Sequence, residues 1–247
     1  MLPPDESRYA RQIALPQIGE VGQRRIRNSR VLIVGLGGLG SPAALYLAGA
    51  GVGELVLVDF DVVEASNLQR QIIHSTDRVG QLKVESARSA IEALNPDCRV
   101  TAIDHELGDD ELREQIRAAS LVLDCSDNFN TRFAVNRCCI EERTPLVSAA
   151  AIRFEGQILP VLPGRGPCYQ CLYPESYEDM PTCEMEGVLG PVVGVMGTLQ
   201  AVQALLILIG EDEELTGRLT LFDALAMRWQ QMQVPPNPGC PVCGGKG

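Results

Sequence analysis

The amino-acid sequence predicts an α/β protein whose sheet is largely parallel and covered by helices. Hydrophobic residues make up 45% of the 247 residues but aromatic residues only 4%, so the core must be built from aliphatic side chains. Near the N-terminus, an apolar run ending in glycines is followed by a small-residue helix and a second apolar run. This composition and order suit a parallel sheet better than a sandwich or a barrel.

The residues near the N-terminus predict a helical arm, a strand, a glycine loop, a helix and a second strand, in that order. We expect an N-terminal helical arm over residues 1–29, with a helix at residues 17–28, and then a buried strand at residues 30–34. Ser41 and Pro42 suit the start of the helix that continues over residues 43–51. The second strand covers residues 54–58. The loop between the first strand and this helix carries the three glycines of a G-x-G-x-x-G pattern, Gly35, Gly37 and Gly40, together with Gly38. This order of strand, glycine loop, helix and strand predicts a nucleotide-binding unit of the Rossmann type.

The rest of the chain continues as alternating helices and strands and then changes character. We find no internal repeat and no low-complexity linker, so we expect one continuous domain over residues 1–247. The predicted helices cover residues 81–94, 109–119, 132–143 and 198–209, and the predicted strands residues 100–103, 121–127, 145–148 and 218–222. A region rich in proline and glycine begins at residue 156, and residues 168–185 are expected to form a long crossover loop.

Composition also limits the partners. A formal net charge of −11 argues against a general nucleic-acid binder, which normally presents a basic face. The N-terminus lacks the basic and apolar regions of a secretory signal. The longest apolar stretch, residues 205–209, is far shorter than a membrane span and is expected to form a buried helix. We therefore expect a cytoplasmic protein with no membrane or nucleic-acid partner.

The glycine loop and the residue after the second strand indicate a nucleotide. Glycines let backbone N–H groups and a helix N-terminus approach a phosphate closely. Asp59, at the end of the second strand, is placed to accept hydrogen bonds from ribose hydroxyls. The alternative is tight strand–helix packing without a ligand, and these residues alone do not separate NAD from ATP.

Two cations after the ribose acid favour a triphosphate. Arg70 follows Ser66-Asn67-Leu68-Gln69, and Lys83 lies further along the chain. Fixed cations stabilise the charge that develops on a leaving pyrophosphate, whereas hydride transfer has no special need for them. The alternative is that both are solvated surface charges.

Asp127 ends the strand predicted at residues 121–127, on the edge where open α/β sheets bind ligands. A carboxylate there suits Mg²⁺ held together with substrate phosphates. The alternative, equally favoured by position alone, is an N-cap for the helix that begins near Arg132.

The nine cysteines divide into metal ligands and buried thiols. Two C-x-x-C pairs predict one structural zinc site made by Cys168, Cys171, Cys240 and Cys243. Cys183 lies in a polar loop and is either a nucleophile or sulfur relay or a bystander; its acidic neighbours would raise its thiol pKa. We interpret the other four cysteines as packing residues; these are Cys98, Cys125, Cys138 and Cys139. We assign no role to His74 or His105.

These motifs together resemble the MoeB/ThiF family, bacterial relatives of ubiquitin-activating enzymes, over nearly the whole chain. Residues 149–157 look more like the MoeB type, and residues 190–200 are at least as similar to the ThiF type. The residues that carry the resemblance are the run 8–12, the glycine loop, Asp59, residues 66–71, Lys83, residues 124–128 and both C-x-x-C pairs.

The resemblance implies ATP-dependent adenylation of the C-terminal glycine of a small ubiquitin-fold sulfur carrier. The MoaD type, for molybdopterin synthesis, is the first expectation, and the ThiS type, for thiamine thiazole synthesis, is the alternative. A nucleotide-binding half over residues 30–150 would be followed by a carrier-binding half over residues 151–247, in which the sheet continues antiparallel. Sulfur would come from a separate donor, a cysteine desulfurase or a rhodanese.

The resemblance also implies roles for single residues. Asp127 would hold Mg²⁺, Asp59 the ribose, and Asn67, Arg70 and Lys83 the phosphates. Arg11 would reach the active site of the other subunit of a homodimer. The implied nucleotide site also takes in Ser66, Leu68, Gln69 and Asn128.

Two other classes of function stay open on the residues alone. A nicotinamide-dependent oxidoreductase would share the first 60 or so residues but has no use for Arg70, Lys83 and the late cysteines. A non-catalytic zinc-bearing binding module would have no use for the set of candidate phosphate ligands.

Overall fold

The computed structural model describes residues 4–173 and 186–244, which form one eight-stranded mixed sheet. The strand order is β3-β2-β1-β4-β5-β6-β7-β8; pairing is parallel from β3 to β5 and antiparallel from β5 to β8. This confirms the predicted fold class. The strands are β1 Arg30–Val34, β2 Glu54–Val58, β3 Arg99–Ile103, β4 Leu121–Asp124, β5 Leu146–Ile152, β6 Glu155–Val161, β7 Arg218–Asp223 and β8 Arg228–Gln233.

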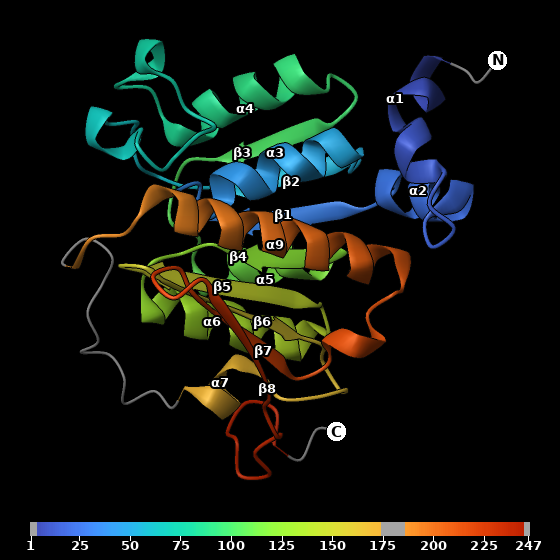
Figure 1. Ribbon diagram of the computed structural model, residues 1–247, viewed down its shortest axis with the longest axis vertical. Coiled ribbons are helices and arrows are strands. Elements are labelled where there is room, and N and C mark those ends of the chain that lie inside the picture. Colours follow the sequence, from blue (N-terminus) through green and yellow to red (C-terminus); the bar gives the residue numbers. More distant parts are fainter. Residues whose placement is uncertain (1–3, 174–185, 245–247) are drawn as a thin grey trace.

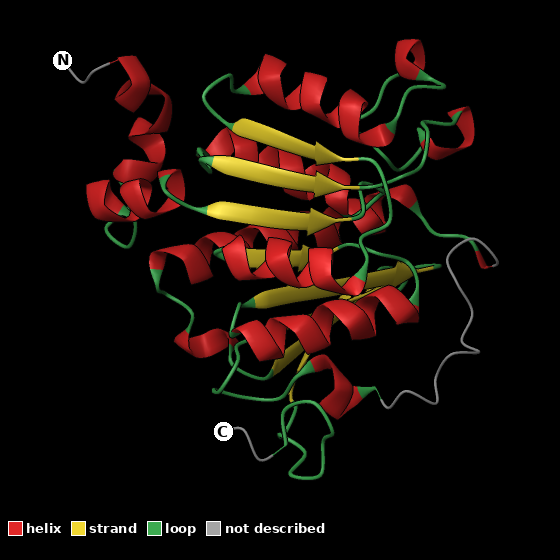
Figure 2. Cartoon of the chain, turned by 180° about the vertical axis from the view of Figure 1, so that it is seen from behind, coloured by secondary structure: helices red, strands yellow, loops and turns green. Residues whose placement is uncertain are grey.

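Helices cover both faces of the sheet. In Figure 1, α3, α4 and α9 lie in front of the strands, and the view from behind in Figure 2 shows the helices of the opposite face. The helices are α1 Pro4–Ile13, α2 Gly19–Arg27, α3 Gly40–Ala50, α4 Lys83–Leu94, α5 Asp109–Ala118, α6 Phe129–Glu142, α7 Tyr169–Leu172 and α9 Gly190–Ile209, with short 3₁₀ turns at Ala65–Asn67, Thr76–Arg78 and Glu213–Leu215.

The parallel strands are buried on both faces, as their continuous apolar runs predict. In β1, Val31 and Ile33 pack into the core under α3 and α9, whereas Leu32 and Val34 pack into the core under α5 and α6. The core is almost wholly aliphatic, in agreement with the low aromatic content.

Helix α9 begins at Gly190, eight residues before the predicted start at residue 198. Its first turns contain glycines, which weaken a helix prediction, but packing requires one of them. A Cβ on Gly197 would lie 2.1 Å from the Leu39 backbone oxygen, so glycine lets α9 approach the start of α3.

Among the described residues, α9 is the one helix long and apolar enough to cross a membrane by length and composition, and half of its apolar window is buried in the protein. It packs against α3 and β5, where it is part of the core.

Most other predicted elements are present with shifted ends; β4, for example, ends at Asp124 and not at residue 127. Strand β6 was missed within the region rich in proline and glycine, the short helix α7 lies in the segment predicted as a crossover loop, and β8 was missed as well. All six residues of β8 are exposed, so the strand has no buried face. Its sequence therefore does not show the alternation of apolar and polar residues that identifies a strand. The helix predicted at residues 17–28 is α2, which begins at Gly19 and is preceded by a separate helix α1. Helix α6 begins at Phe129, earlier than the predicted residue 132.

Candidate active site: two cavities that meet at Asp127

A cavity of about 770 Å³ opens at the carboxyl ends of β1, β2 and β4. This is the edge at which parallel sheets bind ligands. The glycine loop forms one wall, with Gly35 in a left-handed conformation at φ +93°. A Cβ on Gly35 would lie 2.8 Å from the Cys125 backbone oxygen, so a glycine is needed where the loop passes β4.

Asp59 fixes the glycine loop from the end of β2. One of its carboxylate oxygens accepts from the Leu36 backbone N–H at 2.7 Å, and the other accepts from the Asp61 N–H at 3.0 Å. Burial raises the pKa of Asp59, and the neighbouring Lys83 ammonium acts in the opposite direction. The Asp59 carboxylate therefore orders the loop and also lines the cavity.

His74 binds the carbonyl group of the same residue, Leu36. Its Nε2 lies 3.2 Å from the Leu36 carbonyl oxygen, and its Nδ1 lies 2.9 Å from Ser86 Oγ on α4. A carbonyl oxygen only accepts, so Nε2 must carry the proton and Nδ1 accepts from Ser86. Burial lowers the pKa of His74 to about 4, which keeps the ring neutral. The partner of His74 could not be predicted from the sequence, because Leu36 lies 38 residues away along the chain.

The candidate phosphate ligands line the same cavity as the glycine loop. Asn67, Arg70 and Lys83 line the cavity. The Lys83 side chain is only 7% exposed and pairs with Asp61 at 2.7 Å, so it is not a solvated surface charge. The Arg70 guanidinium lies 3.4 Å from the Ser66 backbone oxygen. Four residues expected in this site do not line the cavity, and these are Gly40, Ser66, Leu68 and Gln69.

Asp127 is not the helix N-cap that its position allowed. Asn128 is the N-cap of α6, and its side-chain oxygen accepts from the Thr131 N–H at 2.9 Å. Asn128 thus lines the cavity with its side chain committed to the helix end. Asp127, one residue earlier, is exposed and lies on the cavity wall, where a carboxylate suits Mg²⁺.

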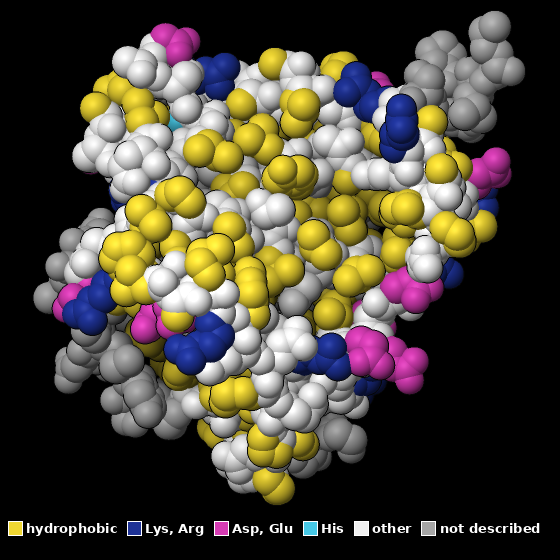
Figure 3. Space-filling view, in the orientation of Figure 1, with side chains coloured by type: hydrophobic (Ala, Val, Ile, Leu, Met, Phe, Trp, Pro, Cys, Tyr) yellow, Lys and Arg dark blue, Asp and Glu magenta, His cyan; other side chains and the backbone are white. Residues whose placement is uncertain are grey.

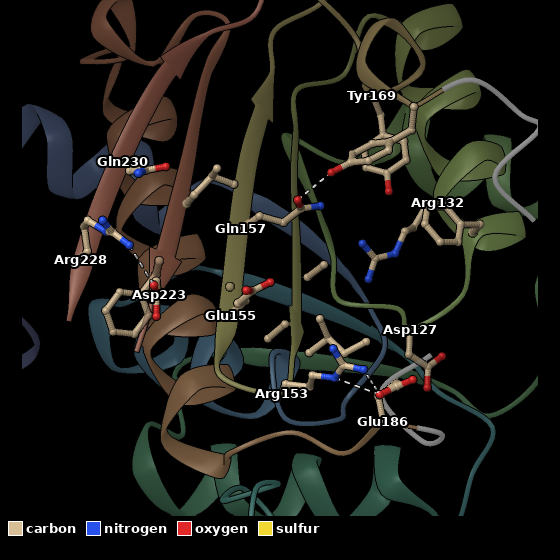
Figure 4. Close-up of a pocket in the computed structure, with 18 residues that line it drawn as sticks. Asp127, Arg132, Arg153, Glu155, Gln157, Tyr169, Glu186, Asp223, Arg228 and Gln230 are labelled. Atoms are coloured by element: carbon tan, nitrogen blue, oxygen red, sulfur yellow. Dashed lines mark hydrogen bonds and ion pairs between the residues drawn. The ribbon is translucent and has the colours of Figure 1, made fainter. Parts of the chain in front are cut away.

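A second cavity of about 490 Å³ lies over the antiparallel half of the sheet, as Figure 4 shows. Its polar side chains are largely paired: Arg153 with Glu186, Arg228 with Asp223 at 3.4 Å, and the Tyr173 hydroxyl with the Gln157 amide oxygen at 2.6 Å. Asp127, Arg132 and Ala151 line both cavities. The two spaces therefore meet beside Asp127.

Sequence reasoning missed Arg132 and Gln157 as site residues. Arg132 lies near the start of α6, and nothing in its local sequence separates it from a surface arginine of that helix. Gln157 lies on β6, and only the pairing of β6 with β5 brings it into the cavity that Asp127 also lines.

The four paired cysteines come together at one end of the sheet. Their sulfur atoms lie within 4.8 Å of one another, with Cys168–Cys240 at 3.6 Å and Cys171–Cys243 at 3.3 Å. Four thiolates around a tetrahedral zinc at 2.3 Å would be separated by about 3.8 Å. The cluster therefore fits a closed, structural zinc site in which α7 is joined to the segment after β8.

The remaining predicted residues have different outcomes. Cys183 lies outside the described residues. Arg11 is exposed on α1 and is not among the residues that line either cavity. His105 is an exposed surface residue beside Glu111, whose carboxylate raises its pKa. The four cysteines assigned to packing are buried, which confirms that assignment; they are Cys98, Cys125, Cys138 and Cys139.

The chain belongs to the ThiF family, whose model matches residues 9–242. It is 47% identical over 242 residues to the sulfur carrier protein ThiS adenylyltransferase of Escherichia coli, covering 98% of this chain and 96% of that protein. It is 48% identical over 238 residues to the Escherichia coli molybdopterin-synthase adenylyltransferase, covering 96% of both. The predicted family is confirmed, and these names agree with the predicted adenylyltransferase class.

Two further similarities extend this picture. The SAMP-activating enzyme E1 of Haloferax volcanii is 46% identical, covering 97% of this chain and 89% of that protein. The crystal structure of Escherichia coli MccB with ATP matches with a TM-score of 0.84 at 24% identity, covering 96% of this chain and 73% of that one. At that identity the structural match shows a common fold. The relatives named here do not support the nicotinamide-dependent oxidoreductase.

Replacing Cys240 by Ser tests the zinc site. We expect the purified protein to hold one zinc per chain, and the Cys240→Ser variant to lose it and more than about 3 kcal/mol of unfolding free energy. Metal analysis and urea unfolding measure both. Cys98→Ala, which removes a buried thiol outside the cluster, is the control and should keep its zinc. A zinc-free wild type, or a Cys240→Ser variant as stable as the wild type, would contradict the site.

The depressed pKa of His74 predicts a pH dependence. Between about pH 6.5 and pH 4 the unfolded chain binds a proton at this residue and the folded protein does not, so stability falls as pH falls. The His74→Gln side chain keeps a hydrogen-bond donor for the Leu36 carbonyl oxygen and has no group that titrates in this pH range. Between about pH 7 and pH 5 it should lose about 1–2 kcal/mol less unfolding free energy than the wild type. Equal losses in urea unfolding would show that His74 is not buried as a neutral ring.

Proposed function

We propose that the protein activates the C-terminal carboxylate of a small ubiquitin-like sulfur carrier by attaching AMP from ATP and releasing pyrophosphate. The observation that supports this most directly is the meeting of two cavities at Asp127. A reaction that joins a nucleotide to a protein tail needs one space for each substrate and one point where they meet. The names of the relatives, each an adenylyltransferase or an activating enzyme, support the same reaction.

The larger cavity takes ATP in this proposal. Backbone N–H groups of the glycine loop face the phosphates, and Asp59 faces the ribose. Asn67, Arg70 and Lys83 neutralise the phosphates and the leaving pyrophosphate. Asp127 would hold Mg²⁺, which bridges phosphate oxygens and neutralises charge when it is bound. Two anions must approach each other here, so positioning and fixed cations supply most of the rate acceleration.

The smaller cavity takes the tail of the carrier. Its floor is β6 and β7, and its inner end reaches Asp127. The hairpin of β7 and β8 beside it exposes large apolar side chains, with Leu225 and Met227 each 75% exposed and Trp229 stacked on Phe222 at 4.3 Å. An exposed apolar group of this kind at the sheet edge suits a docking surface for the folded part of the carrier.

The MoaD-type carrier of molybdopterin synthesis is our first candidate, because residues 149–157, which line this cavity in part, look like the MoeB type. The ThiS-type carrier is the second, because the ThiS adenylyltransferase of Escherichia coli is similar to the same degree. Sulfur transfer would use a separate donor, a cysteine desulfurase or a rhodanese. A relay role for Cys183 stays a prediction.

We further propose a homodimer that works in the cytoplasm. Figure 3 shows apolar side chains gathered over the face that α3 and α9 form in Figure 1. The exposed members on these helices include Tyr46 at 58%, Val195 at 38% and Val202 at 46%. An apolar face of this kind is typical of subunit contacts. Arg11 would then serve the site of the partner subunit.

Exchange of radioactive pyrophosphate into ATP tests the proposed reaction. We expect exchange only when a carrier is present, and the carrier that supports it identifies the pathway. Asp127→Asn should lower the rate by about 100-fold or more, because a ligand for the metal and phosphates is lost. Asp97→Asn is the control, because the Asp97 carboxylate is exposed and is not among the residues that line either cavity. An exchange rate that is the same with and without a carrier, or that is the same in Asp127→Asn as in the wild type, would refute the proposal.

Mixing two inactive variants tests the shared site. If Arg11 acts across the dimer, Arg11→Ala and Asp127→Ala proteins should each be inactive. After subunit exchange, a mixed dimer has one site that lacks both groups and one intact site. We expect a mixture at equal concentrations to recover about a quarter of the wild-type rate, since half of the dimers are mixed and each has one working site. No recovery despite proven exchange would place Arg11 outside the partner's site.

A further inference from the structure

Two hydrogen-bond donors lie at the point where the cavities meet. Arg132 is 7% exposed, lines both cavities and donates from one terminal nitrogen to the Ser126 backbone oxygen at 2.6 Å. Tyr169 is 2% exposed and lines the smaller cavity. Figure 4 shows the Arg132 guanidinium and the Tyr169 ring on the same side of this cavity, across from Gln157.

The Tyr169 hydroxyl is buried without a hydrogen-bond partner among the described residues. A buried polar group without a partner is costly and is rare in native proteins. A phenol is neutral at physiological pH, so the hydroxyl can donate a hydrogen bond. Tyr169 also lies near the Arg132 guanidinium.

The charged side chains that line the smaller cavity indicate where an anion could bind in it. Two of its carboxylates already pair with arginines: Glu186 with Arg153, and Asp223 with Arg228. Asp127, which lines both cavities, is the residue proposed to hold Mg²⁺. Arg132 lines both cavities as well, and this position places its guanidinium to meet an anion that enters from the smaller cavity.

We propose that Arg132 and Tyr169 form a carboxylate subsite that recognises the free C-terminal carboxylate of the carrier and holds it at the nucleotide cavity. This inference rests on the proposed function and names residues that select its protein substrate. A guanidinium presents several N–H groups in one plane, so Arg132 can keep its bond to Ser126 and still donate to a carboxylate. The Tyr169 hydroxyl supplies a second, uncharged donor.

The subsite leaves the carboxylate able to react. One carboxylate oxygen stays hydrogen-bonded while the other attacks the α-phosphorus of ATP. The new bond joins that oxygen to phosphorus, and the bond from the α-phosphorus to the bridging oxygen breaks with its electron pair leaving on pyrophosphate. No proton is transferred. The subsite therefore needs donors and no general base, which matches an arginine and a neutral phenol.

The cysteine cluster positions Tyr169. Tyr169 directly follows Cys168, a member of the cluster. The backbone N–H of Tyr169 donates to the side-chain oxygen of Asn136 on α6 at 2.9 Å. Asn136 lies one turn after Arg132 on the same helix. Helix α6 therefore sets the position of both donors, and Cys168 holds Tyr169 from the other side.

The test compares carriers that differ in one functional group. MoaD-type and ThiS-type carriers are prepared with a free C-terminal carboxylate and with a C-terminal amide, and binding is measured by calorimetry without nucleotide. For a carrier that supports pyrophosphate exchange, wild-type protein should bind the carboxylate form about tenfold or more tightly than the amide, as expected for a charge-assisted hydrogen bond. Arg132→Gln should bind both forms alike, and Arg132→Lys should keep part of the preference.

The ratio of the two dissociation constants decides the outcome, because a purely structural role would weaken both forms together. A folded Arg132→Gln protein that keeps the wild-type ratio overturns the subsite. If Arg132→Gln does not fold, Tyr169→Phe decides: a ratio reduced severalfold supports the subsite and an unchanged ratio overturns it. If wild-type protein supports exchange and shows no preference, the subsite fails while the proposed function stands. If neither carrier supports exchange, the proposed function itself fails.

Discussion

The buried carboxylate of Asp124 is the interaction on which the site depends. It ends β4 and is 1% exposed. One oxygen accepts from the Ser126 backbone N–H and hydroxyl, and the other accepts from the Ser148 hydroxyl of β5 at 2.7 Å. The segment that carries Asp127 is thereby tied to the strand at which the sheet changes from parallel to antiparallel. Because a buried carboxylate is stable only with such partners, this link is specific as well as strong.

Helix α9 reinforces this link from the other face of the sheet. The Gln200 amide donates to the backbone oxygens of Asp124 and Val147, on two neighbouring strands, at 2.9 and 3.1 Å. The same helix approaches α3 through Gly197. One helix therefore fixes the glycine loop, the end of β4 and β5 relative to one another, and so sets the geometry of the junction between the cavities. Its apolar length is explained by this role in the core.

The nucleotide half was predictable because its signals are local. The strand, glycine loop, helix and Asp59 follow one another within 30 residues, and the structure has them in that arrangement. The pairing of the four cysteines was predictable because C-x-x-C spacing reports metal geometry directly. His74, Arg132, Gln157 and Tyr169 were not predictable as site residues, since their partners are far away in the sequence or come from other elements. Strand β8 was missed because an exposed edge strand needs no apolar side of its own.

The central claim is that a carrier tail and ATP meet at Asp127 and that the tail receives AMP. Intact-mass spectrometry of the carrier after incubation with the protein, ATP and Mg²⁺ tests this most directly. The account predicts a gain equal to AMP at the C-terminal glycine, absent when the carrier ends in an amide and absent with Asp127→Asn. A gain equal to phosphate, an adduct elsewhere on the carrier, or labelling of the amide form would contradict it.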